Sequence, residues 1–462
     1  MEVLHMTPST PDAEEQLFVE AARASYRRLK KWERDHPDAT LGELEQQTRQ
    51  ERRVLMGHLI PILLADRARD DPKARPRCPQ CGKRMSFQGE RAVPVETLEG
   101  PITLQRPYYY CRSCHEGFFP LDQGLHLEGQ SSEGVRRDAV ESAALLPSFQ
   151  QGAEHFTRLT GVPMSDTTVH DMMQIYGGRE VAQEAAAAEK ASAAPERGTP
   201  GPGPHAPTPP ERVAFSQDGT TILTYNGWKE VKACSISVFR QEGKRLGEEA
   251  EVRLTQHSYC AGLWDHETLN QHFWWDMQRR QADRSPCQVA VADAAPWIWE
   301  NFAVSAPAAH EVIDWWHALD YFWRVATGVL GQGSAAAAAW MKQRESELWH
   351  GDLPALRGAL HVMVPATDEG KALVRCALAY LDTHDKRLQY PTFRAGGYPL
   401  GSGAVESECK TLVGGRLKHG GQRWKDSGAN AVLAVRCALF SDRWLDVWPM
   451  IYWPPAQTPA TS

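Results

Sequence analysis

The alternation of apolar and polar residues predicts a helical start to the chain. Apolar side chains recur at helical spacing through residues 12–70, in two stretches that Pro37 and Asp38 separate. Proline followed by aspartate favours a turn. We therefore predict a helical N-terminal region over residues 1–72, built around two helices joined by a short turn.

A different pattern follows between residues 73 and 125. Two C-x-x-C motifs flank the strand-like stretch VPVETLEGPITLQRPYYY, which a Gly-Pro pair interrupts. Each motif can present two thiolates to one tetrahedral Zn²⁺, and four thiolates leave no open position for water. The spacing predicts a zinc ribbon with one structural zinc ion; the alternative is four unrelated buried thiols. The predicted ligands are Cys78, Cys81, Cys111 and Cys114, with the neighbouring His115 a less favoured ligand.

The sequence of residues 126–190 predicts a helical domain that contains a turn typical of a helix-turn-helix motif. Gly161 favours a turn, and Ser165 can cap the helix that follows it. Val169 and Met172 would then face the core. The segment could read DNA, or it could be an ordinary helical hairpin. Residues 191–211 are rich in proline and glycine and predict a linker.

Strand patterns dominate the next part of the chain. VAFSQD, TILTYN and VKACSISVF predict antiparallel strands, and CQVAVAD is apolar enough for a buried parallel strand. We expect residues 212–317 to form the first part of an α/β domain and residues 393–450 its last part. Residues 318–392 are mostly helical in pattern and predict an insertion, and residues 451–462 a tail.

Three carboxylates stand at informative places in this pattern. Asp218 ends one strand-like run, Asp293 ends another, and Glu406 lies in the helical run GSGAVESECK. Taken singly, the aspartates could be turn or capping residues, and Glu406 could pair with Lys410 four residues later. Together they provide hard anionic oxygens from separate elements, as two-metal phosphodiester chemistry requires.

Several separated motifs resemble those of the ISKra-type insertion-sequence transposases. They are DGT followed by GWKEVK, D-x-x-PWIW, DWWH, GSGAVES-x-CK and RLK-x-GG-x-RW, spread over roughly residues 75 to 450. The resemblance implies a DDE enzyme with a ribonuclease H-like catalytic core of α/β class. Asp218, Asp293 and Glu406 would bind two Mg²⁺ (or Mn²⁺) ions, first to free a 3′-OH and then to join it to target DNA. Ala294 departs from the pattern, which has glycine after the second aspartate.

Two further features lie near these carboxylates. Asp314 and His317 form a D-x-x-H motif similar to one in Mutator-like families, and His317 could contact the scissile phosphate or be a buried histidine. Five tryptophans surround the motifs; most should be core, and one or two could stack on an unpaired base. These are Trp297, Trp299, Trp315, Trp316 and Trp323.

A basic segment follows Glu406. Residues 405–425 contain five basic and two acidic side chains, which could form a solvated helical face or contact DNA. Their place just after a predicted catalytic carboxylate favours DNA contacts. The residues predicted to touch phosphates are Arg416, Lys418, Arg423 and Lys425.

Composition narrows the setting and the partners. A net charge of −7 argues against indiscriminate coating of nucleic acid, and no apolar run reaches the roughly 18 residues of a membrane span. We expect a cytoplasmic, nucleoid-associated protein that binds double-stranded DNA at terminal inverted repeats and at target sites, as a homodimer or higher oligomer. The alternatives are a structure-selective metal nuclease of the same fold and a DNA-binding regulator derived from a transposase.

Overall fold

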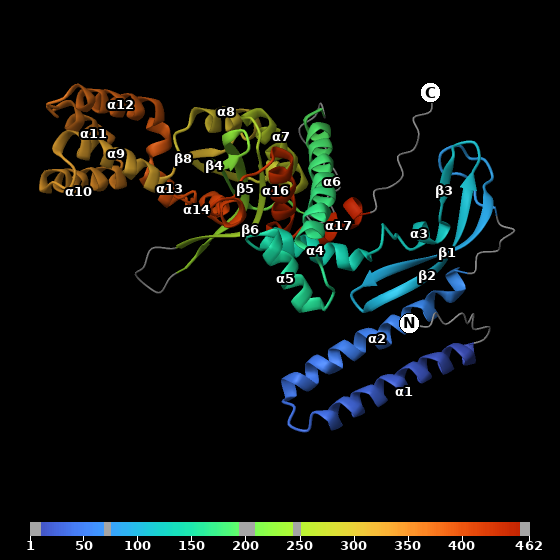
Figure 1. Ribbon diagram of the computed structural model, residues 1–462. Helices are drawn as coiled ribbons and strands as arrows, with labels where there is room; N and C mark the ends of the chain where they lie inside the picture. Colours follow the sequence, from blue (N-terminus) through green and yellow to red (C-terminus); the bar gives the residue numbers. More distant parts are fainter. Residues whose placement is uncertain (1–10, 69–74, 194–207, 244–250, 453–462) are drawn as a thin grey trace. The chain divides into compact units, whose positions relative to one another are not determined.

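The computed structural model describes residues 11–68, 75–193, 208–243 and 251–452, and its architecture is mixed α/β (Figure 1). The chain separates into two compact units. Unit 1 comprises Met1–Met172 with Tyr452–Ser462, and unit 2 comprises Met173–Ile451. Among the described helices, none combines the length and the apolar character needed to cross a membrane. Most of the predicted linker, residues 194–207, lies outside the described residues, as does the tail after Tyr452.

Unit 1 begins with the two expected helices, α1 (Pro11–Asp35) and α2 (Leu41–Ala68), which pack against each other. A reciprocal cap starts α2: the Thr40 N–H donates to Glu43 Oε2 at 2.7 Å, and the Glu43 N–H donates to Thr40 Oγ1 at 3.3 Å. This capping box satisfies two N–H groups that a helix start leaves without partners. The local sequence therefore ends the turn and sets the start of α2.

A three-stranded antiparallel sheet follows, in the order β1-β2-β3. Its strands are β1 (Ser86–Thr97), β2 (Gly100–Cys111) and β3 (Glu116–Phe118). Alternate side chains of β1 and β2, including Val95 and Ile102, form a small core that α2 covers with Ile60 and Leu64. This period of two is what a sheet with one buried face requires.

Helices complete unit 1. The turn after α5 is the predicted one: Gly161 has a left-handed φ of 75°, and Ser165 Oγ accepts the Thr168 N–H at 3.1 Å. Val169 and Met172 are buried, as the apolar pattern predicted. The helices are α3 (Pro120–Gly124), α4 (Glu133–Leu145), α5 (Phe149–Thr160) and α6 (Asp166–Ala193), and α6 from Met173 onward belongs to unit 2.

Unit 2 is built on a five-stranded mixed sheet in the order β6-β5-β4-β7-β8. The first three strands are antiparallel, and β7 and β8 run parallel to β4. The strands are β4 (Arg212–Thr224), β5 (Gly227–Glu242), β6 (Glu251–Gly262), β7 (Cys287–Ala292) and β8 (His310–Ile313).

Helices pack on this sheet. Phe215 of β4 contacts Phe273 edge to face, and Phe273 contacts Phe302 in the same way, so α7 (His266–Arg279) and α8 (Pro296–Ser305) share one core with the sheet. The helix α14 and the π-helix η3 contact β4 and β5, while α16 packs on β6. Their bounds are α14 (Gly403–Ser407), η3 (Glu408–Gly414), α15 (Gly415–Leu417), α16 (Asp426–Phe440) and α17 (Trp444–Tyr452).

A group of helices separates β8 from α14, where the sequence predicted an insertion. Figure 1 shows α9 to α12 gathered on one side of the sheet, beyond β8. Trp315 attaches them to the sheet unit, because its ring packs edge to face on both Trp349 and Tyr390. The helices are α9 (Trp315–Leu330), α10 (Ala335–His350), α11 (Leu353–His361), α12 (Asp368–His384) and α13 (Tyr390–Ala395), with the 3₁₀ turns η1 (Ala282–Arg284) and η2 (Asp385–Leu388).

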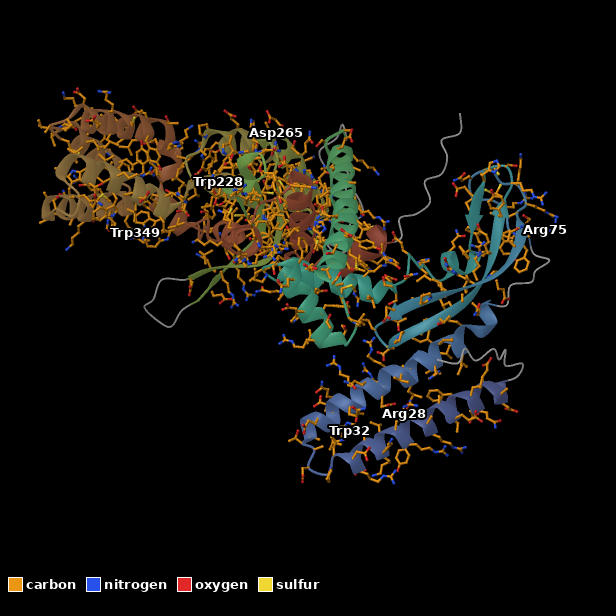
Figure 2. The ribbon with its side chains drawn as sticks, in the orientation of Figure 1. Arg28, Trp32, Arg75, Trp228, Asp265 and Trp349 are labelled. Atoms are coloured by element: carbon orange, nitrogen blue, oxygen red, sulfur yellow. The ribbon has the colours of Figure 1, made fainter. Side chains whose placement is uncertain are left out.

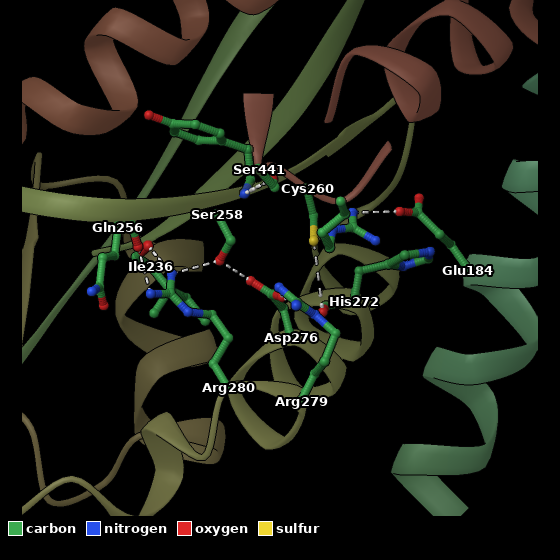
Figure 3. A network of polar contacts seen from close by, with 12 residues as sticks. Glu184, Ile236, Gln256, Ser258, Cys260, His272, Asp276, Arg279, Arg280 and Ser441 are labelled. Carbon is green, nitrogen blue, oxygen red and sulfur yellow. Dashed lines mark hydrogen bonds and ion pairs between the residues drawn. The ribbon is translucent and has the colours of Figure 1, made fainter. Parts of the chain in front are cut away.

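A buried ionic network joins α6 and α7 to β6 (Figure 3). Glu184 of α6 pairs with Arg443 at 2.9 Å. Asp276 of α7 pairs with Arg279 at 2.5 Å and accepts the Ser258 hydroxyl of β6. Charges this well buried are tolerated when they are paired and hydrogen-bonded. The bond between Ser258 and Asp276 ties α7 to β6, and the pair of Glu184 and Arg443 ties α6 to the turn between α16 and α17.

Candidate functional site

Two of the predicted carboxylates lie on neighbouring strands. The parallel ladder of β4 and β7 ends at the pair Phe215 and Ala290, three residues before each aspartate. Beyond the ladder, Asp218 and Asp293 lie close enough for the charge of Asp293 to act on the Asp218 carboxyl. Asp293 directly follows the last residue of β7. Neighbouring strands are about 4.8 Å apart, so a continuation of this register would bring the two aspartates to adjacent points.

The environment of Asp218 draws on four segments of the chain. Burial raises the pKa of the Asp218 carboxyl, and hydrogen bonds from the Gly219 N–H and the Cys409 thiol lower it. The charge of Asp293 raises this pKa further, and His317 lowers it. Gly219 N lies 2.7 Å from Asp218 Oδ1. Asp218, Asp293, His317 and Cys409 are thus brought together, and the contact with Cys409 was not predicted from sequence.

The turn that holds Asp293 is well fixed. Asp293 Oδ1 accepts the Ala295 N–H at 2.8 Å, and the Trp299 indole donates to the Asp293 carbonyl at 2.9 Å. Ala294, where the family pattern has glycine, is not among the residues with positive φ. The backbone therefore needs no glycine at this position, and the departure from the pattern leaves the turn unstrained.

The D-x-x-H motif divides into a structural aspartate and an accessible histidine. Asp314 is fully buried, and its Oδ1 caps α9 by accepting the His317 N–H at 2.9 Å. Its Oδ2 accepts the Ser402 N–H at 2.5 Å and the Ser402 hydroxyl at 2.9 Å. Asp314 thus ties the start of α9 to the segment entering α14, whereas the side chain of His317 is exposed near Asp218.

Glu406, the third predicted carboxylate, belongs to α14, and its side chain lies outside the described part of the structure. The helix itself contacts β4 and β5. Three residues further on, Cys409 hydrogen-bonds to Asp218 from the π-helix η3. Short π-helical stretches occur frequently at functional sites. The backbone that carries Glu406 is therefore packed on the strand that carries Asp218.

The basic segment after Glu406 runs along the far end of β4. Lys418 donates to the Thr220 hydroxyl, and Trp424 forms a β-bridge with Thr224. Thr220 is two residues beyond Asp218, so its side chain lies on the same face of β4. Three of the four basic residues predicted to contact DNA have exposed side chains, namely Lys418, Arg423 and Lys425.

Arg416 has a different environment from the other three basic residues. Its side chain is only 1% exposed, and its guanidinium lies over the Trp424 ring, 4.9 Å from the centroid. Burial lowers the pKa of Arg416 to about 10. In this packing Arg416 supports the basic segment from beneath and does not present its charge to a phosphate.

The cysteine cluster of unit 1 has the geometry of a metal centre. The four sulfurs all lie within 4.8 Å of one another. Among the described residues, they are the set of three or more possible metal ligands that come this close together. Sγ–Sγ distances are 3.9 Å for Cys78 and Cys114 and 3.6 Å for Cys81 and Cys111. A tetrahedral Zn²⁺ with bonds of 2.3 Å needs sulfurs about 3.8 Å apart. The cluster can therefore hold one ion such as zinc.

The turns that present these sulfurs are alike. Gly82 follows the first C-x-x-C pair with a φ of 69°, and His115 follows the second with a φ of 58°. The His115 ring is directed to Tyr110, with Nδ1 3.3 Å from the hydroxyl. The Cys114 backbone N–H is the main cause that lowers the pKa of Cys111, whereas the Cys81 thiol and burial raise the pKa of Cys114, so without a metal the cluster favours a thiolate at Cys111 first.

Comparison with known protein families gives a match over part of the chain. Residues 71–196 match the model of an uncharacterised protein family, UPF0236. The matched part includes the cysteine cluster and α3 to α6, covers less than half of the chain, and ends before β4. No curated protein matches this chain.

Proposed function

We propose that this protein is a DDE transposase that binds insertion-sequence ends, hydrolyses a phosphodiester to free a 3′-OH, and joins that 3′-OH to target DNA. The observation that carries the proposal is that Asp218 of β4 and Asp293, directly after the parallel neighbour β7, lie close enough for their charges to interact. The packing of α14, which contains Glu406, on β4 supports it. The sheet order, with an acid on the central antiparallel strand and another after the adjacent parallel strand, is the arrangement expected of a ribonuclease H-like core.

The residues present suit divalent metal ions. Asp218 and Asp293 offer hard carboxylate oxygens from adjacent strands, and Glu406 would complete the set from α14. Two bound Mg²⁺ ions would supply activation of the attacking oxygen and stabilisation of the leaving oxygen. Asp314 and Ser402 would hold α9 and α14 in register, and the exposed His317 would contact the scissile phosphate.

The basic segment would provide a surface beside this site that binds DNA phosphates. Lys418 sits over Thr220, on the same face as Asp218, and Arg423 and Lys425 continue the exposed charge toward the end of β4. Cationic side chains beside carboxylates that must meet a phosphodiester would hold the DNA backbone by its phosphates. These contacts set position and affinity and are independent of base sequence.

The test uses the purified full chain with Mg²⁺ and duplex DNA carrying the sequences that flank its gene. The account predicts a nick that leaves a 3′-OH at the element end, followed by a product in which that end is joined to a second DNA. Cleavage without joining would identify the structure-selective nuclease instead. Specific binding to the ends with neither product would identify the DNA-binding regulator.

A further inference from the structure

The hairpin formed by β4 and β5 extends past the rest of the sheet. The ladder of β4 with β7 ends at Phe215, and the ladder of β5 with β6 begins only at Lys232. Within the five-stranded sheet, residues 219–231, here called the ribbon, therefore pair only with each other across the hairpin. At about 3.4 Å per residue, the ribbon reaches roughly 20 Å beyond Asp218. It turns at Tyr225 and Asn226, where Gly227 has a φ of 94°.

One face of the ribbon is anchored to the basic segment. Lys229 pairs with Asp426 at 2.5 Å, and Lys418 donates to the Thr220 hydroxyl. At the tip, Trp424 N donates to the Leu223 carbonyl at 3.1 Å, and Tyr225 N donates to the Trp424 carbonyl at 3.0 Å. A two-stranded ribbon is marginally stable alone, so these contacts give it a fixed direction.

The other face of the ribbon is open and carries an exposed tryptophan. Trp228 pairs with Leu223 in the ladder, on the face opposite to Asp218. Its side chain, labelled in Figure 2, is 71% exposed, and Tyr225 at the tip is 67% exposed. Glu230 on the same face is neutralised by Lys232 at 2.9 Å. Two large rings are thus held in solvent on a rigid support.

We propose that Trp228, assisted by Tyr225, stacks on an unpaired base of the bound DNA where that DNA meets the end of the ribbon, on the face turned away from Asp218. The inference rests on the proposed transposase function and names the form of DNA that the site takes. In a duplex the faces of the bases are covered by their neighbours, whereas an unpaired base exposes its face to an indole ring. Lys418 lies over Thr220 on the Asp218 face of the ribbon, so its exposed charge, with those of Arg423 and Lys425, would hold DNA phosphates on the side of the cleavage site.

The test compares two DNAs that differ only in a short single-stranded extension. Dissociation constants are measured at one salt concentration for the wild-type chain and for Trp228→Leu and Trp228→Phe. Leucine keeps an apolar side chain without a ring, and phenylalanine keeps a ring. We expect the wild type and Trp228→Phe to prefer the extended DNA about tenfold, and Trp228→Leu to lose that preference while binding the paired DNA unchanged.

Trp316 on α9 provides a matched control, because it is also an exposed tryptophan of unit 2, at 68%. Trp316→Leu should keep the preference for the extended DNA. The fluorescence of a base analogue such as 2-aminopurine, placed in the extension, should be quenched when the wild type binds and should not be quenched when Trp228→Leu binds.

If Trp228→Leu keeps the preference, or if Trp316→Leu alone removes it, the assignment to Trp228 is overturned while the transposase proposal stands. If the wild type binds neither DNA, both fall together.

Discussion

Asp293 directly follows β7 at the carboxyl end of the parallel ladder, and its charge acts on Asp218, which lies three residues past the end of that ladder on β4. Open α/β sheets place ligands at this edge, because strand ends meet there and leave side chains free. Two like charges so close raise the free energy of the doubly ionised site, and a bound cation lowers it. A divalent cation held between them, as proposed, would therefore stabilise the pair.

The cysteine cluster predicts a measurable metal content. Metal analysis of the purified chain should find about one zinc ion, since one set of four thiolates makes one closed site. Replacing Cys81 and Cys114 by serine should remove it and expose β1 to β3 to proteolysis, because the small core around Met85 and Tyr109 includes two of the ligands. Cys376→Ser, an exposed cysteine on α12, is the control. Unchanged zinc in the double variant would refute the assignment.

The salt dependence of DNA binding tests whether the basic segment contacts phosphates. Replacing Lys418, Arg423 and Lys425 by alanine should weaken binding to all DNA sequences and reduce the slope of log K against log salt by roughly one per lost contact. Lys371→Ala, on the exposed face of α12, should leave the slope unchanged. If the triple variant keeps the wild-type slope, the basic segment is a solvated surface that does not contact DNA.

Arg416 should behave differently from its three neighbours. Arg416→Ala removes a buried side chain packed on Trp424, so we expect a loss of stability of about 2 kcal/mol, with the salt slope of the surviving protein unchanged. Thermal unfolding separates the two effects, because the surface substitutions should leave the melting temperature nearly constant. A stable Arg416→Ala protein with a reduced slope would place Arg416 on the DNA surface.

The buried carboxyl of Glu180 predicts a pH dependence. Burial, followed by the charge of Glu184, raises the pKa of Glu180 to about 9, so the folded protein holds a proton that the unfolded chain releases above pH 4.5. Stability from this group is full below the unfolded pKa and falls as pH rises toward 9. Glu180→Gln should therefore be more stable than the wild type, by an amount growing about 1.4 kcal/mol per pH unit between pH 6 and 8.5.

Melting temperatures at several pH values test this expectation. Glu189→Gln, on an exposed position of the same helix, should follow the wild type at every pH. A constant difference between Glu180→Gln and the wild type would mean that Glu180 is ionised in the folded protein, held by Arg443.

The sequence was most informative where local spacing decides structure. The alternation of apolar residues and the C-x-x-C spacing predicted the helices of unit 1, its sheet and the converging sulfurs, because these depend on neighbours along the chain. The turn at Gly161 and the cap at Ser165 are equally local. The sequence correctly placed Asp293 directly after a strand. It was wrong about Asp218, which lies inside β4, because VAFSQD and TILTYN, predicted as two strands, form the single strand Arg212–Thr224 that pairs with β5 along its length.

Features that depend on long-range packing could not be predicted. Arg416 is buried because its guanidinium packs on the Trp424 ring, and the spacing of charges along the sequence does not encode this contact. Likewise, Asp314 uses both carboxylate oxygens within the fold because Ser402 arrives from a distant segment. Trp228 is exposed because β4 and β5 extend beyond the adjacent strands, and this depends on the lengths of all the strands in the sheet.

Direct measurement of divalent metal binding tests the central claim, the metal site at Asp218 and Asp293. Mn²⁺ is titrated into the zinc-loaded full chain, and its affinity is compared for the wild type, Asp218→Asn, Asp293→Asn and the control Asp265→Asn. Asp265 caps α7, and asparagine caps a helix as well as aspartate does, so this control should bind Mn²⁺ normally. The account predicts that Asp218→Asn and Asp293→Asn each lose at least about tenfold in affinity, about 1.4 kcal/mol, while keeping the melting temperature of the metal-free wild type. Wild-type Mn²⁺ affinity in both variants would contradict it.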